Sequence, residues 1–160
     1  MLDAALQLPG ESKILVNDRL DIALAGKAAG VHLTETSVSA RDARKLAGSL
    51  SAPPGFLVGV SCHSLDIARA ANDSGADYLV FGPVFPTPSK AAYGAPQGLE
   101  RLAELCRTVG IPVLAIGGID LQNAASCLAA GASGIAAIRL FQDAADLPAT
   151  VRALHALPLR

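Results

Sequence analysis

Residues 112–138 read PVLAIGGIDLQNAASCLAAGASGIAAI, and this stretch holds one full repeat of the pattern that decides the fold. An apolar run turns at two glycines, continues as an Ala-rich segment and returns to a second apolar run. In the Ala-rich segment the apolar residues recur at helical spacing, at Leu121, Ala124, Ala125, Leu128 and Ala129. Asp120 stands directly before them and is suited to be the helix N-cap. The stretch therefore predicts a strand, a helix and another strand.

The same alternation runs through the 160 residues of the chain. Short apolar runs predict strands at Lys13–Val16, Gly30–Leu33, Phe56–Val60, Asp77–Phe81, Pro112–Ile116 and Gly134–Ile138. Most of these runs are continuous, which is typical of strands covered on both faces in a parallel sheet. Because no hairpin signal separates them, the sequence predicts a parallel α/β fold.

Two parallel architectures compete for this pattern. A doubly wound dinucleotide-binding sheet would show G-x-G-x-x-G after its first strand, and the sequence has none. The TIM (β/α)8 barrel is therefore favoured, although a full barrel has eight units in roughly 250 residues. We expect residues 1–160 to form a single, incomplete barrel domain of about six units. Its two end strands would leave open edges, which favours a homo-oligomer.

Composition excludes several classes of protein. Hydrophobic residues make up 51% and charged residues 17% of the chain, so it is not intrinsically disordered. With a net charge of −1 and no basic patch, we expect no nucleic-acid partner. No leader pattern precedes the first strand, and no uncharged stretch is apolar enough for a membrane span. Three scattered cysteines, Cys62, Cys106 and Cys127, predict neither disulfides nor zinc, which suits a reducing cytoplasm.

Polar residues gather where the predicted strands end, which is where barrel enzymes place their chemistry. They are Asn17, Asp18, His32, Ser61, Cys62, His63, the stretch 82–90, Gly117, Gly118 and Arg139. Residues 82–90 read GPVFPTPSK and offer two hydroxyls and a lysine to an anion, unless they form an ordinary surface loop. The two glycines would let backbone amides approach a phosphate.

Single residues in this set allow more than one interpretation. Asp18 is either a Mg²⁺ ligand beside a diphosphate or a helix cap. His63 is either a general base or a structural histidine. Cys62 has no recognisable activating partner for a nucleophile. Arg139 would meet either a phosphate or an acidic side chain.

Together these motifs resemble the thiamine phosphate synthase and TenI thiazole tautomerase family. The resemblance extends from about residue 13 to residue 140, and its most specific part is the loop GPVFPTPSK combined with the turn AIGGI at residues 115–119. Further matching segments are 16–19, 30–33, 59–64, 98–99, Asn123 and 131–136.

The resemblance implies a transferase that joins a hydroxymethylpyrimidine diphosphate to a thiazole phosphate and releases pyrophosphate. It implies that Asp18 holds Mg²⁺ with Asn17 beside it, and that His32 lies near the pyrimidine. It assigns the diphosphate to Ser61, Thr87, Ser89 and Lys90, with Lys90 and Ser61 as the catalytic residues. It assigns the thiazole phosphate to the backbone at Gly118, Ile138 and Arg139.

The sequence departs from the family pattern in three places. A Gln-Leu-Arg-x-Lys diphosphate motif belongs to a unit before the first strand, and residues 1–12 resemble only the tail of that unit's helix. Ser37 replaces the second Mg²⁺ carboxylate, and Glu35 could substitute only if its loop shifted. Arg139 stands where the family often has Ser.

These departures keep two alternatives open. The missing carboxylate favours a thiazole tautomerase, an isomerase that needs no Mg²⁺, but Pro83 replaces the His expected in a tautomerase loop. The missing units favour a non-catalytic barrel fragment that binds phosphorylated ligands.

Overall fold

The protein is described by a computed structural model that covers residues 12–87 and 95–158. Its six strands form one sheet in which every neighbouring pair is parallel and the spatial order equals the chain order. The strands are β1 (Leu15–Asn17), β2 (Gly30–Leu33), β3 (Leu57–Cys62), β4 (Tyr78–Phe81), β5 (Val113–Ile116) and β6 (Gly134–Ala136).

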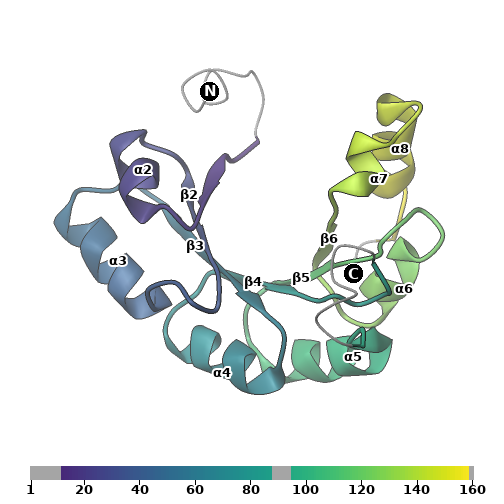
Figure 1. Ribbon diagram of the computed structural model, residues 1–160, viewed down its shortest axis with the longest axis horizontal. Coiled ribbons are helices and arrows are strands. Elements are labelled where there is room, and N and C mark those ends of the chain that lie inside the picture. The colour runs from purple at the N-terminus through teal and green to yellow at the C-terminus, as the bar shows by residue number, and fades with distance from the viewer. Residues whose placement is uncertain (1–11, 88–94, 159–160) are drawn as a thin grey trace.

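Helices cover the convex side of this sheet, which curves into an arc (Figure 1). They are α2 (Leu20–Ala25), α3 (Ala40–Ser49), α4 (Leu65–Asp73), α5 (Gly98–Thr108) and α6 (Ala124–Ala129), while α7 (Arg139–Gln142) and α8 (Leu147–His155) follow β6 at one end of the arc. A doubly wound sheet would carry helices on both faces and reverse its strand order. The prediction of an incomplete barrel of parallel β/α units is therefore confirmed.

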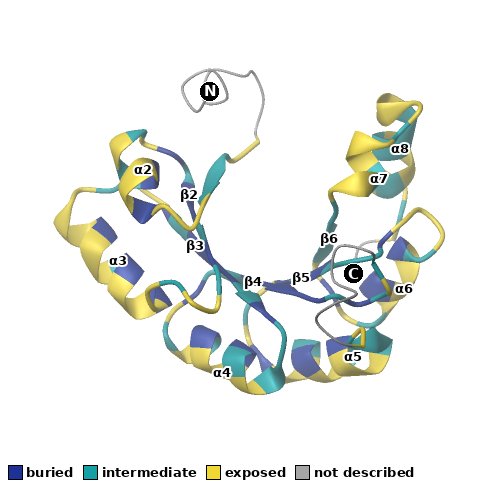
Figure 2. Cartoon of the chain, viewed as in Figure 1, coloured by how far each residue is buried: buried dark blue, intermediate teal, exposed yellow. Residues whose placement is uncertain are grey.

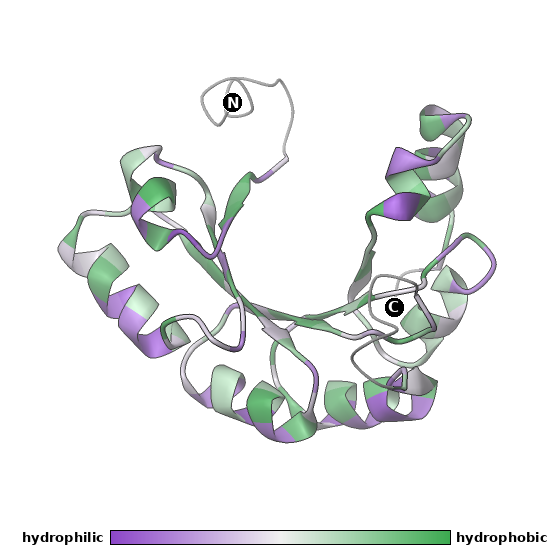
Figure 3. Cartoon of the chain, viewed as in Figure 1, coloured by the Kyte–Doolittle hydropathy of each residue, from purple (hydrophilic) through white to green (hydrophobic). Residues whose placement is uncertain are grey.

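Small residues bring the helices close to the sheet. On α3 the buried residues are Ala40, Ala43 and Ala47, which recur along one stripe. The side chains of the convex sheet face are fully buried beneath such stripes, among them Val31, Leu33, Val58, Leu79, Phe81 and Ala115. Figure 2 shows the buried residues on the inner sides of the helices, and Figure 3 shows hydrophilic residues on their outer sides.

The concave face of the sheet differs from the expectation that both faces are covered. Several of its side chains are only half-buried, namely His32, Leu57, Ser61, Tyr78 and Leu114, whereas Val80 is buried. The expectation was wrong for this face because strands that follow one another in order, with right-handed crossovers, place every helix on the same side. Polar side chains are therefore tolerated on the concave face.

Element boundaries differ from the prediction mainly around α6 and β6. The Asp120 carboxylate accepts the amides of Gln122 and Asn123 at 2.8 and 2.9 Å, so it holds a turn there. Asn123 takes the N-cap position, and α6 begins at Ala124. The last strand ends at Ala136, two residues before the predicted end, and Arg139 opens α7.

Three further expectations concern membrane-spanning helices, the cysteines and the oligomeric state. Among the described residues, no helix combines the length and apolar character needed to cross a membrane. Cys62, Cys106 and Cys127 are all free thiols. In the described sheet β1 pairs only with β2 and β6 only with β5, and the predicted homo-oligomer stays a prediction.

A charged clamp holds β3, β4 and α3 together at the amino ends of the strands. One Asp77 carboxylate oxygen accepts the buried Val58 amide at 2.6 Å, and the other lies 2.5 Å from Arg44 of α3. Arg44 also donates to the Gly75 carbonyl, and the Asp77 amide donates to Val58 O at 2.8 Å. The clamp therefore fixes which residues of β3 and β4 stand side by side.

We expect Asp77→Ala to lower the free energy of unfolding by about 1–3 kcal/mol, because the buried Val58 amide loses its acceptor. Urea unfolding measures this change. The matched control is Asp66→Ala, which removes a surface ion pair with Arg69 whose Asp66 side chain is 94% exposed. We expect the control to change stability by less than about 0.5 kcal/mol. Equal effects of the two variants would contradict the clamp.

Candidate functional site

The predicted site residues that the structure describes all lie toward the carboxyl ends of the strands. They form three groups: Asn17, Asp18 and Ser37 after β1 and β2; His32 and Ser61 on β2 and β3, joined by the unpredicted Tyr78 from the start of β4; and a cavity at the ends of β4, β5 and β6. Because the strands are parallel, these ends share one edge of the sheet.

The first group surrounds the carboxylate of Asp18. This residue follows β1 in a left-handed backbone conformation, with φ at 61°, and its amide donates to the His32 carbonyl at 2.8 Å. The Ser37 hydroxyl donates to the Asp18 carboxylate and in turn accepts the Thr34 amide at 2.8 Å. Asp18 and Asn17 are both exposed.

This group offers few ligands to a metal ion. Glu35 does not join it, because its carboxylate accepts the His63 amide at 2.8 Å near the end of β3. In the part of the chain that the structure describes, no three His, Cys, Asp or Glu residues are grouped as metal ligands. A complete Mg²⁺ site built from these side chains alone does not fit. One carboxylate does suit a Mg²⁺ ion whose other ligands are diphosphate oxygens and waters.

The second group is a hydrogen-bonded row on the concave face. His32 Nδ1 lies 3.0 Å from the Tyr78 hydroxyl, and His32 Nε2 lies 2.8 Å from the Ser61 hydroxyl. Burial lowers the pKa of His32, so its ring is neutral at pH 7. Burial and the neighbouring Asp77 charge raise the pKa of Tyr78, so the phenol stays protonated.

Two residues after β3 were open to a catalytic interpretation. The His63 ring nitrogen Nδ1 contacts the Gly82 carbonyl and therefore donates to it, which ties the end of β3 to the loop after β4. Burial, with a contribution from Glu35, raises the pKa of the Cys62 thiol to about 12. A thiol that stays protonated is a poor nucleophile, so these contacts favour a structural role for both residues.

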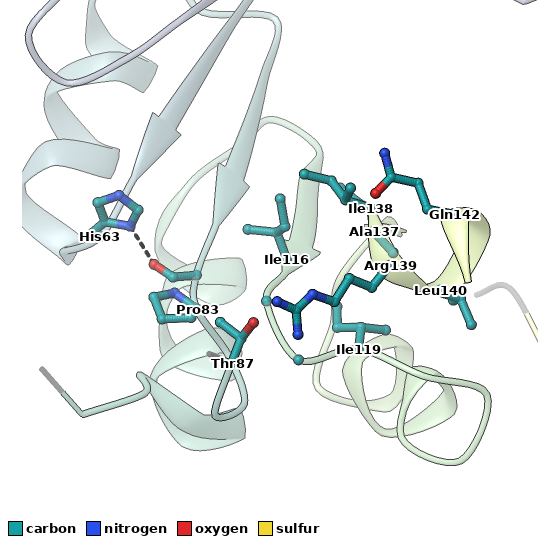
Figure 4. A pocket seen from close by; sticks show the side chains of 14 residues that line it. His63, Pro83, Thr87, Ile116, Ile119, Ala137, Ile138, Arg139, Leu140 and Gln142 are labelled. Atoms are coloured by element: carbon teal, nitrogen blue, oxygen red, sulfur yellow. Dashed lines mark hydrogen bonds between the residues drawn. The ribbon is translucent and has the colours of Figure 1, made fainter. Parts of the chain in front are cut away.

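The third group lines a cavity of about 280 Å³. Its lining includes Pro83, Thr87, Gly117, Gly118, Ile138 and Arg139. In Figure 4 the Arg139 side chain extends from the start of α7 toward Thr87 and Ile119. The cavity thus combines a cationic side chain, a hydroxyl and a turn of two glycines with apolar walls.

The glycine turn is shaped by its contact with the loop after β4. Gly117 and Gly118 have φ values of 95° and 65°, which disfavour other residues. A Cβ at Gly118 would lie 2.5 Å from the Pro86 carbonyl oxygen. The Val84 and Phe85 amides donate to the carbonyls of Ile116 and Gly117 at 2.9 and 3.0 Å. The two loops therefore form one rigid wall of the cavity.

The structure brings together most of the residues singled out in the sequence. Asn17 lies beside His32 in the strand register, and Thr87, Gly118, Ile138 and Arg139 share the cavity. Ser89 and Lys90 lie outside the described residues, and the roles of all these residues stay predictions. Sequence reasoning missed Tyr78; the available signals were a phenol in an otherwise apolar strand and a glycine, Gly59, in the middle of the preceding strand.

Comparisons with known proteins agree on one family. A family model described as thiamine monophosphate synthase matches residues 4–141. A "Putative thiamine-phosphate synthase" of Geobacter sulfurreducens is 50% identical over 91% of this chain and 66% of its own length. A "Thiamine-phosphate synthase" of Roseiflexus sp. is 47% identical over 90% of this chain and 59% of its own length. The chain thus spans about six tenths to two thirds of these relatives.

A solved structure shows the same relationship in three dimensions. A thiamine phosphate pyrophosphorylase from Pyrococcus furiosus superimposes with a TM-score of 0.78 at 36% sequence identity, over 92% of this chain and 67% of that one. The part-barrel fold and the sequence motifs therefore lead to the same assignment, and the chain belongs to the thiamine monophosphate synthase family.

Proposed function

We propose that this chain carries the thiamine phosphate synthase site, which couples a hydroxymethylpyrimidine diphosphate to a thiazole phosphate. The observation that carries the proposal is the shared edge: a cationic cavity suited to a phosphate and the Asp18, His32 and Ser61 groups lie at the same ends of one parallel sheet. The family relationship supports the same reaction.

The chemistry asks for stabilisation of charge more than for a strong base. The C–O bond to the diphosphate breaks, pyrophosphate leaves with the electron pair, and the thiazole nitrogen forms a C–N bond with the pyrimidine carbocation. A neutral His32 and a protonated Cys62 suit this reaction, since neither acts as an anionic nucleophile. We propose that His32 faces the pyrimidine and that Ser61, Thr87, Ser89 and Lys90 bind the diphosphate, Ser61 and Lys90 catalytically.

The thiazole phosphate is assigned to the cavity. The backbone at Gly118 in the glycine turn, together with the backbone at Ile138 and Arg139, would bind the phosphate oxygens. The guanidinium of Arg139 adds a fixed positive charge. Asp18, with Asn17 beside it, would hold the Mg²⁺ ion that neutralises part of the diphosphate charge when both are bound.

Formation of thiamine phosphate from the two substrates with Mg²⁺ tests the proposal directly. We expect activity in a chain extended at its N-terminus by a unit with the Gln-Leu-Arg-x-Lys motif, and weaker activity in the 160-residue chain. The control is the extended chain with Lys90→Ala, which should lose most of its turnover while binding thiazole phosphate normally. A folded extended chain that forms no thiamine phosphate would overturn the proposal.

A second candidate is the thiazole tautomerase activity, and Ser37 at the second carboxylate position is the observation in its favour. A tautomerase would isomerise its thiazole substrate equally well in a chelator, whereas the synthase would not. A third candidate, a binding module, would bind pyrophosphate or thiazole phosphate and turn over neither.

We expect Arg139→Gln to weaken binding of thiazole phosphate about three- to tenfold, because an exposed charge pair contributes modestly. Isothermal calorimetry measures the affinity, and Arg41→Gln on the outer face of α3 is the matched control. The affinity of Arg139→Gln for pyrophosphate should stay within twofold of the parent chain. An unchanged affinity for thiazole phosphate would place that phosphate elsewhere.

We expect Mg²⁺ and pyrophosphate to tighten each other's binding by the same factor, as thermodynamic linkage requires. Ser37→Asp should raise the Mg²⁺ affinity about tenfold, because a second carboxylate joins Asp18. Ser37→Asn, which adds no charge, is the matched control. Calorimetric titration of Mg²⁺ with and without pyrophosphate, in the parent chain and both variants, tests the two expectations. Equal Mg²⁺ affinity in both titrations, or no gain from the aspartate, would contradict the assignment of Asp18.

A further inference from the structure

Tyr78 reaches across a neighbouring strand to contact His32. His32 lies on β2, Gly59 on β3 and Tyr78 on β4, and the strand register places the three residues in one row. A Cβ on Gly59 would lie 2.1 Å from the ring carbon Cζ of Tyr78. The missing side chain of Gly59 thus makes the space that the tyrosine ring occupies. The two rings stack with their centroids 5.7 Å apart.

The direction of the hydrogen bonds in this row follows from the different donor strengths of its two hydroxyls. A neutral imidazole carries one N–H, so one ring nitrogen donates and the other accepts. Within the described chain, His32 is the hydrogen-bond partner of the Tyr78 hydroxyl and also that of the Ser61 hydroxyl. Either tautomer leaves one hydroxyl proton of the row without an acceptor within the described chain, that of Tyr78 or that of Ser61. A phenol is a stronger donor and a weaker acceptor than an aliphatic hydroxyl, so the phenol donates to Nδ1.

The proton position on the His32 ring also determines which atom donates in the contact with Ser61. With Nδ1 accepting, the proton of His32 is on Nε2, which donates to the Ser61 oxygen at 2.8 Å. The serine hydroxyl then has no need to donate to the histidine, and its own proton is available for another acceptor. The opposite tautomer would use that proton for the contact with His32.

We infer that Tyr78 is a positioning residue: its hydroxyl holds His32 in the Nε2–H tautomer, and this tautomer directs the Ser61 proton toward a bound anion. The inference rests on the proposed function only in naming that anion as a diphosphate. Tyr78 does not touch the anion in this arrangement. It acts through His32, and Gly59 permits the contact.

The first test reads the tautomer of His32 by ¹⁵N NMR of the ring nitrogens in the free protein. We expect the Nε2–H form in the parent chain and a mixture of tautomers in Tyr78→Phe, which keeps the ring and removes the hydroxyl. Gly59→Ala keeps the hydroxyl but displaces the ring, and it should cause the same change. A predominant Nδ1–H form in the parent chain, or an unchanged tautomer in Tyr78→Phe, would overturn the inference.

The second test measures pyrophosphate binding in a double-mutant cycle with Ser61→Ala. We expect Tyr78→Phe to weaken binding about three- to tenfold, the effect of one neutral hydrogen bond. In a Ser61→Ala background the same substitution should have no further effect, because Ser61 is the group that it directs. Additive losses in two folded variants would indicate a merely structural tyrosine and overturn the inference.

The two tests separate this inference from the proposed function. A parent chain that binds no pyrophosphate, in a protein shown to be folded by urea unfolding, contradicts the diphosphate assignment. The tautomer measurement needs no ligand, and its result then decides the part of the inference that concerns Tyr78 and His32.

Discussion

The parallel direction of the six strands is the constraint on which the rest of the molecule depends. It sends every strand-to-helix connection over the convex face, so small alanines are used there to bring helices close to the sheet. It also gathers the ends of β1 to β6 at one edge. Residues separated by more than a hundred positions in the chain, such as Asp18 and Arg139, therefore belong to one functional edge.

The part of the fold that follows from local pattern could be predicted from sequence. β2 was predicted to the residue, because Gly30 and Thr34 limit a short apolar run. The end of β6 could not, since Ala137 and Ile138 continue the apolar pattern beyond the last paired residue. The carboxylate of Asp120 has the chemistry of a helix cap, but only the backbone shows that it caps a turn.

The site was predictable where a motif carried it and unpredictable where it depends on register. The loop after β4 and the glycine turn after β5 are recognisable as sequence, and the structure joins them into one wall. The contact between His32 and Tyr78 spans three strands and requires Gly59 to stand between them. No spacing in the sequence specifies that alignment. Ser37, by contrast, is recognisable from the sequence alone as a departure from the family pattern, and its hydroxyl contacts Asp18.

The clamp at Asp77 has a consequence beyond stability. Asp77 is the residue immediately before Tyr78, and its two hydrogen bonds with Val58 set the alignment that places Gly59 under the tyrosine ring. A slip of one residue would put Val58 or Val60 there and expel the ring. The clamp at the amino ends of the strands thus also sets the position of the Tyr78 ring on the concave face. Loss of the Asp77 carboxylate is therefore expected to disturb the stacking of Tyr78 on His32 as well as the stability of the sheet.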